Sequence, residues 1–586
     1  MPEYLAPGVY VEETSFRAKS IEGVGTSTTA FVGPTRKGPY RTDEDTPEAS
    51  ELLTSYGDFE RIYGGFADLD LGDDVPGINY MAHAVRAFFN EGGSRLYVSR
   101  VVGADAELSA VAVVSSATAS ETVSFTARFP GASGNGSVIV RENVLPATDT
   151  MLTNSPEGTL VRTGSGGTTA FHVKVAGTWR PAGDLAGTAV LQSTLTTTPA
   201  VITVTVITVD GDGESLSYED LGVAPGHPRG IGHVLAAVPS RRADYLQNPF
   251  AISIGGTVSP AELHTGLFNA AVANTAGQRE RVWALAGGED GAAPTSTEYA
   301  LALSEIASLE DVSIVAAPGS SAYGDEDDAQ AIANVLIAHA ESRRAYRIAV
   351  LDTPPANLPS DARTYRGQFD SKYAALYYPW VVIPNPLARP GRDDIPKEIA
   401  LPPSGFVSGI YARNDVQRGV HKAPANEVVR GALRFEIDVN FAQQEMLNPL
   451  GVNCLRFFSG RGNRVWGARL ASSDPEWKYV SDRRYFNYLE ASIDRSTQWA
   501  VFEPNGERLW ANVRQTITDF LYNEWRSGAL LGTSQEEAFF VRCDRSTMTQ
   551  NDLDNGRLIC LIGVAIIKPA EFVIFRIGQK TADARA

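Results

Sequence analysis

The chain has 586 residues, of which 43% are hydrophobic and 20% charged, and it carries a net charge of −18 at pH 7. This length exceeds what one hydrophobic core holds, so we expect about three or four domains. The acidic balance argues against a nucleic-acid-binding protein, because neutralising phosphate groups requires a basic surface.

The three cysteines, Cys454, Cys543 and Cys560, are scattered along the chain. Their odd number and spacing indicate neither a disulfide framework nor a zinc site, which fits synthesis in a reducing compartment. The N-terminus lacks the basic region and apolar run of a signal peptide, and no run of about 18 apolar residues would span a membrane. We therefore expect a protein that is made in the cytoplasm and does not insert into a membrane.

Residues 4–13 contain a Pro-Gly turn followed by a short alternating run: Val9, Tyr10, Val11 and Glu12. This pattern predicts a strand, and a strand alone at a terminus would fray without a partner. From the residues alone, the simpler interpretation is an edge strand of its own domain. The alternative is a strand that pairs with another subunit.

Residues 27–103 are predicted to form a compact α/β segment. The apolar run at 29–33 indicates a strand, and residues 79–90 place apolar side chains at helical spacing. A Gly-Gly pair would end this helix before the next strand at 96–98.

From 104 to 228 the composition shifts to Thr, Ser, Val, Ala and Gly. Apolar and polar side chains alternate at 201–206, and turn clusters at 163–167 and 210–213 separate such runs. The segment is therefore predicted to be an all-β insertion.

The segment 229–425 alternates between predicted strands and helices: strands at 282–285, 312–317 and 347–352, and helices at 296–309 and 329–341. Such alternation predicts βαβ units with a parallel sheet.

Residues 426–568 are expected to form a further domain with two amphipathic helices. Apolar side chains recur at helical spacing over 482–494 and again over 507–525, where Asn505 is the predicted N-cap. Two helices with one apolar face each pack most simply on a sheet.

The chain ends with two predicted strands. Residues 557–564 are almost continuously apolar, which indicates a strand buried on both faces. Pro569 breaks this run, and residues 571–577 form a separate alternating strand with three large apolar side chains on one face. We therefore expect the end of the chain to be an arm that lies outside the preceding domain.

The sequence contains no phosphate-binding loop of the form GxxxxGK[ST], no HExxH motif and no GxSxG elbow. Its seven histidines show no metal-ligand spacing, and His339 lies on the apolar face of a predicted helix. Asp210, Asp212 and Glu214 resemble part of a calcium loop, but Ser215 stands where that loop needs Gly, so a polar turn is the simpler interpretation. No catalytic, cofactor-binding or metal-ligating residue is therefore predicted, although an α/β domain can host a hydrolase site.

Three blocks near the C-terminus occur in a specific order and spacing: GRGNRVWGAR (460–469), KYVSDRR (478–484) and VFEPN (501–505). Together they resemble the C-terminal domain of contractile tail sheath proteins, which come from phage tails and phage-tail-like injection systems. Earlier blocks resemble the same family: PGVYVEE (7–13), FFNEGGSRLYVSRV (88–101) and PPSGFVSGIYARNDVQRGVHKAPAN (402–426). Leu470 departs from the Thr expected at its position.

The resemblance implies a multidomain α/β and α+β fold. It consists of a central α/β sheath domain, a C-terminal α+β domain with exchanged terminal strands, and the all-β insertion on the outside. In chain order, the expected parts are an N-terminal arm (1–26), an α/β segment of the core (27–103), the insertion (104–228), the central domain (229–425), the C-terminal domain (426–568) and a C-terminal arm with tail (569–586).

The resemblance also implies a structural subunit that is not an enzyme and needs no cofactor. Such subunits stack as six-fold rings around an inner tube and contract to drive the tube through a target envelope. The expected partners are other sheath subunits, the inner tube protein, and baseplate and terminal cap proteins; the sequence leaves open whether sibling sheath proteins share the same tube. Neither nucleic acid nor direct membrane insertion is expected. The particle would be a phage tail or a phage-tail-like particle whose subunits are made in the bacterial cytoplasm. A hydrolase and a non-contractile capsid or surface-layer protein are the alternatives.

Two sets of residues are expected to carry these contacts. The terminal strands would be exchanged with neighbouring subunits through Val9, Tyr10, Val11, Glu12, Phe572, Val573, Ile574, Phe575, Arg576 and Ile577. Arg483 and Arg484 are a paired positive charge on an acidic chain and would face the lumen, where they contact acidic groups on the tube. The alternative is that they pair with local carboxylates such as Glu490.

Overall fold

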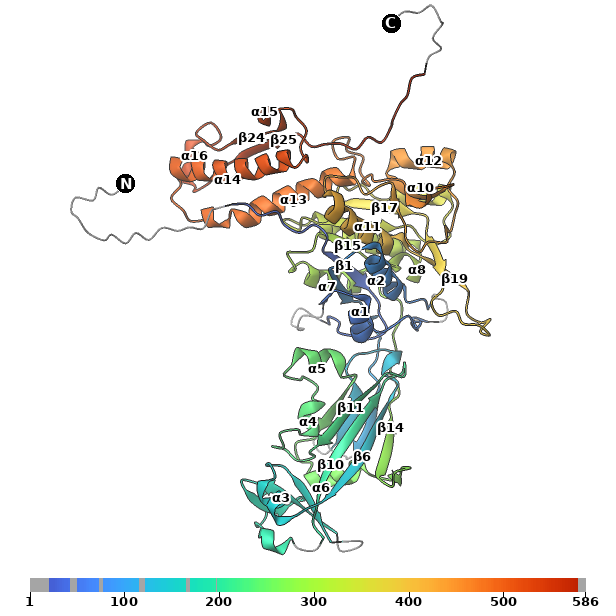
Figure 1. Cartoon of the computed structure of the whole chain (residues 1–586), viewed down its shortest axis with the longest axis vertical. Helices are drawn as coiled ribbons and strands as arrows, with labels where there is room; N and C mark the ends of the chain where they lie inside the picture. The colour runs from blue at the N-terminus through green and yellow to red at the C-terminus, as the bar shows by residue number, and fades with distance from the viewer. Residues whose placement is uncertain are drawn as a thin grey trace, which may run out of the picture.

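The computed structural model describes residues 20–42, 50–72, 77–114, 122–164, 169–195 and 198–577. The predicted strand Val9–Glu12 lies outside these residues. In Figure 1, a central body carries the C-terminal helices on one side and the β-rich region below it. Across the described ranges, no helix combines the length and the hydrophobicity needed to cross a membrane.

The central body is built on a nine-stranded sheet in the order β2-β3-β1-β15-β16-β17-β22-β23-β20. The strands from β3 to β22 run parallel, and the outer pairs are antiparallel. The strands are β1 (Thr29–Gly33), β2 (Glu51–Leu53), β3 (Leu96–Arg100), β15 (Ile314–Ala316), β16 (Ile348–Asp352), β17 (Ala374–Tyr378), β20 (Glu427–Val428), β22 (Val452–Phe458) and β23 (Gly462–Val465). Strands from three of the predicted parts, 27–103, 229–425 and 426–568, therefore share one sheet.

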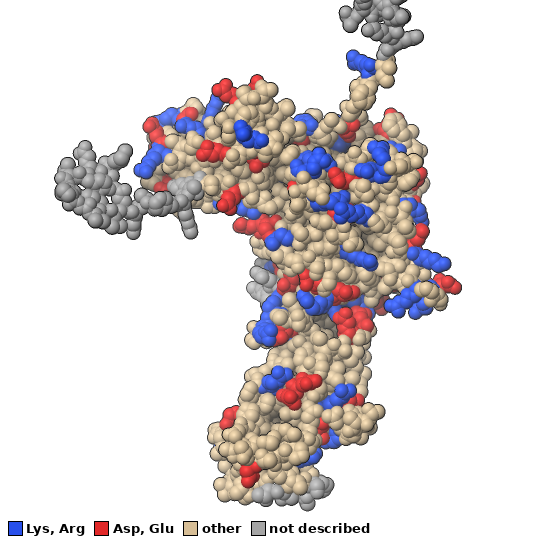
Figure 2. Space-filling view, in the orientation of Figure 1, with Lys and Arg blue, Asp and Glu red and all other residues tan. Residues whose placement is uncertain are grey.

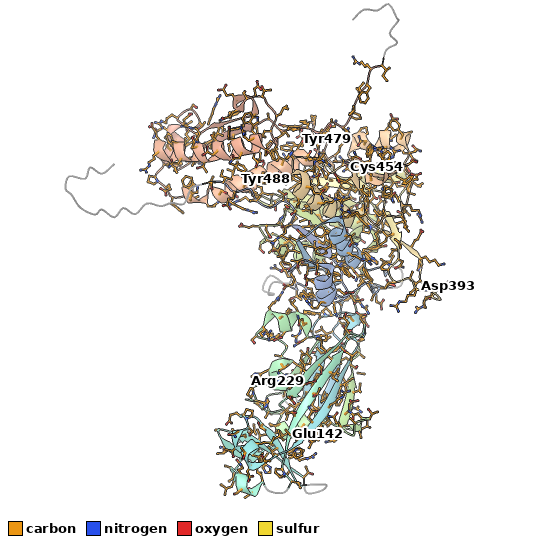
Figure 3. The ribbon with its side chains drawn as sticks, viewed as in Figure 1. Glu142, Arg229, Asp393, Cys454, Tyr479 and Tyr488 are labelled. Carbon is orange, nitrogen blue, oxygen red and sulfur yellow. The ribbon has the colours of Figure 1, made fainter. Side chains whose placement is uncertain are left out.

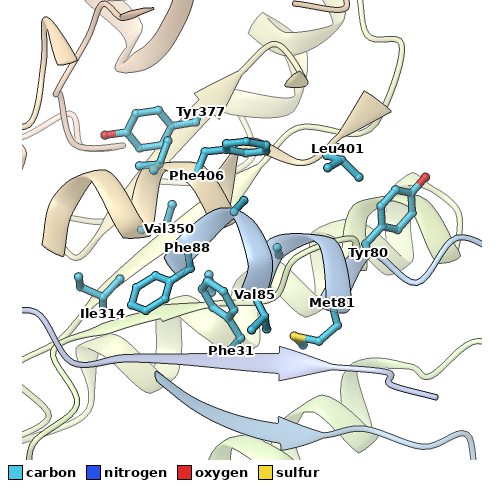
Figure 4. Close-up of a cluster of buried hydrophobic side chains, with 14 of the residues drawn as sticks. Phe31, Tyr80, Met81, Val85, Phe88, Ile314, Val350, Tyr377, Leu401 and Phe406 are labelled. Atoms are coloured by element: carbon cyan, nitrogen blue, oxygen red, sulfur yellow. The ribbon is translucent and has the colours of Figure 1, made fainter. Parts of the chain in front are cut away.

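Helices cover both faces of this sheet, as the burial of its central strands requires. One face packs against α1 (Tyr56–Tyr63), α2 (Tyr80–Glu91) and α11 (Pro403–Arg418), and the other against α7 (Ser296–Ile306), α9 (Glu326–Glu341) and α10 (Pro359–Arg366). Figure 4 shows the first of these cores, where Phe31, Val85, Phe88, Ile314 and Phe406 come together. The body also contains α8 (Ser320–Tyr323), α12 (Phe441–Leu447) and a small sheet of β18 (Val381–Pro384), β19 (Glu398–Leu401) and β21 (Arg434–Phe435).

Helices α2 and α11 approach each other closely because α11 has glycines at the contact. A Cβ atom at Gly409 would lie 2.6 Å from the carbonyl oxygen of Phe88, and a Cβ atom at Gly405 would lie 2.7 Å from the Cα atom of Ala84. Further along α11, Arg413 pairs with the buried Glu91 of α2. The close backbone approach and the buried ion pair together hold α11 on α2.

Gly409→Val should therefore destabilise the free subunit, because the backbone of α2 cannot move away without opening the core. Overpacking of this kind costs about 1–3 kcal/mol, and we expect a lower apparent Tm in thermal unfolding. The matched control is Gly256→Ala, since no heavy atom lies within 4 Å of a Cβ added at Gly256. An unchanged Tm for Gly409→Val would contradict the close packing of the two helices.

The β-rich region contains an eight-stranded and a three-stranded sheet around a main apolar core, with a smaller buried apolar cluster at Leu152, Val161, Trp179 and Leu195. Its strands are β4 (Ala110–Val114), β5 (Val123–Ala127), β6 (Ser137–Pro146), β7 (Leu160–Thr163), β8 (Ala170–Val175), β9 (Thr178–Pro181), β10 (Ala200–Val209), β11 (Ser215–Leu221), β12 (Phe250–Ile254), β13 (Val272–Ala273) and β14 (Arg279–Ala284). It also contains four short α-helices: α3 (Asp149–Asn154), α4 (Ile231–Val234), α5 (Arg242–Gln247) and α6 (Pro260–Leu267). Only α3 lies within residues 104–228, which were predicted to be all-β, so that segment is β-rich with one short α-helix.

The boundary predicted at 228 is too early. Strand β12 pairs with β5 and strand β14 pairs with β6, so the β-rich region continues through β14. The strand predicted at 282–285 therefore belongs to this region and not to the central domain. The side chain of Trp283 in β14 is buried in the core between the two sheets of the β-rich region, which explains why this strand belongs there.

Ion pairs join the β-rich region to the central body where the molecule narrows, and charged side chains gather there in Figure 2. Lys37 Nζ lies 2.9 Å from Asp210 Oδ2 and 2.8 Å from Glu214 Oε2. Arg36 Nη2 lies 3.0 Å from Asp212 Oδ1. The three acidic residues weighed as calcium ligands thus have basic partners from the segment after β1.

The C-terminal domain packs α13 (Val480–Ser496) and α14 (Glu507–Arg526) around an apolar core with β24 (Phe539–Arg542) and β25 (Leu561–Val564). Both predicted helices are confirmed. Gly506, and not Asn505, is the N-cap of α14, and Asn505 Oδ1 accepts a hydrogen bond of 2.7 Å from the indole of Trp510. Two short helices, α15 (Gln535–Ala538) and α16 (Gln550–Asp554), complete the domain.

Candidate assembly interface

The segment after Glu571 leaves the body of the subunit and points away from it (Figure 1). Residues 572–577 form no helix and no strand, and they pair with no strand among the described residues. Their five apolar side chains are between 68% and 96% exposed: Phe572, Val573, Ile574, Phe575 and Ile577. Such a run of large exposed apolar side chains is typical of a segment that is covered by a partner.

Strands β24 and β25 form a separate two-stranded sheet in the C-terminal domain. Phe540 and Leu561 are each 50% exposed, so the strand predicted at 557–564 is not buried on both faces. That prediction is wrong because Leu561 and Ile562, which point to opposite faces of β25, are 50% and 37% exposed. Among the described strands, β25 pairs with β24 alone. Unpaired edge groups accept further strands readily, and two short strands alone are marginally stable.

Arg483, which was predicted to contact the inner tube, is buried among residues of its own subunit. The residue is 2% exposed. Its Nε donates to Asn487 Oδ1 at 2.8 Å and its Nη2 donates to Glu490 Oε1 at 2.8 Å. Its guanidinium also lies over the rings of Tyr373 and Trp477. The alternative interpretation, pairing with a local carboxylate, is the one the structure supports.

Arg484, also predicted to contact the tube, is likewise buried, at 3% exposure, and its partners lie within its own subunit. It forms a two-pronged pair with Asp415 of α11, with Nη1–Oδ1 at 2.9 Å and Nη2–Oδ2 at 2.6 Å. Its Nη2 also donates to the carbonyl oxygen of Thr26, and the Thr26 hydroxyl donates to Asp415 at 2.6 Å. Arg484 therefore joins α13, α11 and the chain that leads into β1.

Arg484→Ala should destabilise the free subunit, because it leaves the Asp415 carboxylate buried without its cation. Breaking a buried pair in this way costs about 3–5 kcal/mol, which denaturant unfolding of the subunit alone would detect. The matched control is Arg508→Ala on the exposed side of α14. A loss of tube binding with unchanged stability of the subunit would restore the lumen-facing interpretation.

The hydrolase alternative has its best geometric candidate at the end of β16. Asp352 Oδ1 and Oδ2 accept hydrogen bonds from the backbone N–H of Ser404 at 2.7 Å and from its hydroxyl at 2.5 Å. Burial raises the pKa of Asp352 to about 7, although the bonds from Ser404 lower it. Ser404 is completely buried and occupied by this carboxylate, so it is not placed to attack a substrate. Among the described residues, no group of three or more His, Cys, Asp and Glu side chains is arranged to hold a metal ion.

Two family models match consecutive parts of the chain. The phage tail sheath protein central domain matches residues 292–469, and the phage tail sheath C-terminal domain matches residues 472–580. The first model ends and the second begins between the last strands of the nine-stranded sheet and α13. The matches thus cover the central body after the β-rich region and the whole C-terminal domain.

Two curated relatives are also tail sheath proteins. A putative prophage major tail sheath protein of Pseudomonas aeruginosa is 26% identical over 270 residues, which are 45% of this chain and 64% of the relative. The tail sheath protein of Vibrio phage KVP40 is 23% identical over 188 residues, or 31% of this chain and 27% of the relative. The match therefore spans less than two thirds of either relative's length.

The fold of the whole chain is similar to the helical sheath of the anti-feeding prophage in its contracted state. The TM-score is 0.53 at 20% identity, and the likeness covers 98% of this chain and 100% of the other. From the matching blocks in the sequence, the two family models and the curated relatives, we conclude that the chain belongs to the contractile tail sheath protein family.

Proposed function

We propose that this protein is a sheath subunit that polymerises as stacked six-fold rings around an inner tube and contracts to drive the tube through a target envelope. Its partners are copies of itself, the inner tube protein, and baseplate and terminal cap proteins. The single observation that carries the proposal is the exposed apolar segment 572–577, which extends from a member of the sheath family and pairs with no strand among the residues that the structure describes.

The link between subunits is an exchanged strand. Residues 572–577 of one subunit add to the β24–β25 sheet of a neighbour, where main-chain hydrogen bonds and pockets for alternate side chains stabilise the added strand. Burying Val573, Phe575 and Ile577 contributes about 5–9 kcal/mol before the costs of association. Ordering the segment and fixing the two subunits removes a large part of that gain. The N-terminal strand Val9–Glu12 makes a second link of the same kind.

The mechanical work comes from two packings of the same subunit and needs no nucleotide. Two assembled states that differ in free energy are enough to drive a rearrangement once it is triggered. Exchanged strands keep the subunits connected while their bodies rotate and slide between the two packings. The subunit is therefore a structural protein in this proposal, with no catalytic residue and no cofactor.

Electron microscopy of the purified protein tests this function. Helical tubes in one or two fixed lattices are the expected result. Closed shells or flat sheets would instead favour a capsid or surface-layer protein, and a protein that stays monomeric while it hydrolyses a substrate would favour an enzyme.

A further inference from the structure

The exposed C-terminal segment begins directly after a firmly held residue, Glu571. Arg469 donates two hydrogen bonds to its carboxylate, from Nε to Oε1 at 2.8 Å and from Nη2 to Oε2 at 2.6 Å. Asn448 Nδ2 donates to Oε1 at 2.7 Å, and the hydroxyl of Tyr479 donates to Oε2 at 3.0 Å. In Figure 3, Tyr479 lies close to the place where the segment leaves the body. The chain thus passes from a residue held by four hydrogen bonds to an exposed segment within one residue.

The groups that hold Glu571 are themselves fixed to the nine-stranded sheet. The backbone N–H of Arg469 donates to Asn453 Oδ1 at 2.6 Å, and Asn453 Nδ2 donates back to the carbonyl oxygen of Arg469 at 2.8 Å. Asn453 lies in β22, and Arg469 forms a β-bridge with Tyr479 just before α13. The anchor for the arm is therefore part of the rigid frame of the subunit.

The charges at this site favour a persistent contact. The side chain of Arg469 is 8% exposed, and a bidentate arginine–carboxylate pair in a partly buried place is stronger than a neutral hydrogen bond. Burial raises the pKa of Glu571, but the hydrogen bonds from Arg469 and Asn448 lower it more, and the net pKa lies below its usual range. The carboxylate is therefore ionised at neutral pH, where the pair with Arg469 is complete.

We propose that Glu571 and Arg469 are positioning residues that fix the point at which the exchanged C-terminal strand leaves its subunit. The proposal rests on the strand exchange described above. Because a chain spans at most about 3.3–3.6 Å per residue, a strand that starts at Phe572 has almost no slack between its anchor and the neighbour. The C-terminal arm then links two subunits over a fixed distance. The bodies of the two subunits rotate about this link, which we call the pivot.

The first test measures the anchor in the free subunit. Spin labels on Val573→Cys and on Asn512→Cys of α14, in a Cys560→Ser background that leaves the two buried cysteines, report the distance between arm and body. Glu571→Ala should broaden the distance distribution about twofold or more, since the arm loses its fixed neighbour. Glu503→Ala, at an exposed carboxylate in the loop before α14, should leave it unchanged. An equally narrow distribution in Glu571→Ala would overturn the proposal.

The second test measures the pivot in the assembled sheath. Four Gly-Ser residues inserted between Glu571 and Phe572 keep the anchor but add slack, and should abolish regular tubes or change their helical lattice. The same insertion after Ile577 is the matched control and should leave the wild-type lattice. Wild-type tubes from the first insertion would overturn the pivot. They would not affect the exchanged strand itself, which is tested separately by truncation after Glu571.

Discussion

A chain truncated after Glu571 should remain a folded, soluble subunit that forms no sheath tubes. The subunit keeps its stability because residues 572–577 are exposed and add little to its own core. Assembly fails because each subunit loses the strand that would pair with its neighbour's β24–β25 sheet. If about 4 kcal/mol of net contact free energy is lost per link, the concentration needed for polymerisation rises about a thousandfold.

Gel filtration and thermal unfolding check the subunit, and negative-stain microscopy with sedimentation checks the tubes. Truncation after Ile577 is the control, since it keeps the strand and should still polymerise. Phe575→Asp is a point variant with the same expected loss, because it places a charge in the buried face of the exchanged strand. Regular tubes from the shorter chain would refute strand exchange.

The sequence alone predicted the helices and strands whose apolar residues recur at a regular spacing or form one continuous run. The helices α13 and α14 follow from apolar stripes, and strands such as β1 and β16 follow from continuous apolar runs. The pattern did not reveal which strands pair. Strands β12 to β14 have between two and six residues and lie among helices, so they look like part of an α/β domain. Only the pairing of β12 with β5 and of β14 with β6 shows that these strands close the β-rich region.

Among the candidate interface residues, those defined by a local pattern were also predicted from the sequence, whereas those defined by contacts between distant residues were not. The exposed segment 572–577 was predicted as an arm because Pro569 separates it from the preceding strand. The partners of Arg484 and Glu571 were not predicted, since Asp415 and Arg469 lie far from them in sequence. The sequence of an arginine pair such as Arg483 and Arg484 is the same whether the side chains are exposed to solvent or paired with buried carboxylates, so sequence alone does not distinguish the two cases. For these residues, burial in the folded subunit decides the role.

The β-rich region should be removable without loss of tube formation, provided that the cut respects its strands. The chain enters and leaves the region side by side, because Glu107 and Glu289 form a β-bridge with mutual backbone hydrogen bonds of 3.0 and 3.2 Å. We propose that the region lies on the outside of the sheath. A turn of about two to four residues spans such an antiparallel pair, so a short Gly-Ser linker can replace residues 108–288.

This variant should form tubes with a smaller outer diameter, since the nine-stranded sheet and the C-terminal domain stay intact. Asp290 keeps its bond to the backbone N–H of Asp70 at 2.8 Å and its ion pair with Arg36. The matched comparison replaces residues 104–228, the boundary that sequence alone suggests. That variant should be insoluble, because β12 and β14 lose their pairing partners and Trp283 loses its core.

Microscopy of both proteins, with circular dichroism of the soluble one, distinguishes the outcomes. A folded 108–288 replacement that forms no tubes would mean that the β-rich region makes contacts that polymerisation needs. A soluble 104–228 replacement would mean that β12 to β14 are stable without the strands they pair with, contrary to the expectation that unpaired short strands do not persist in water.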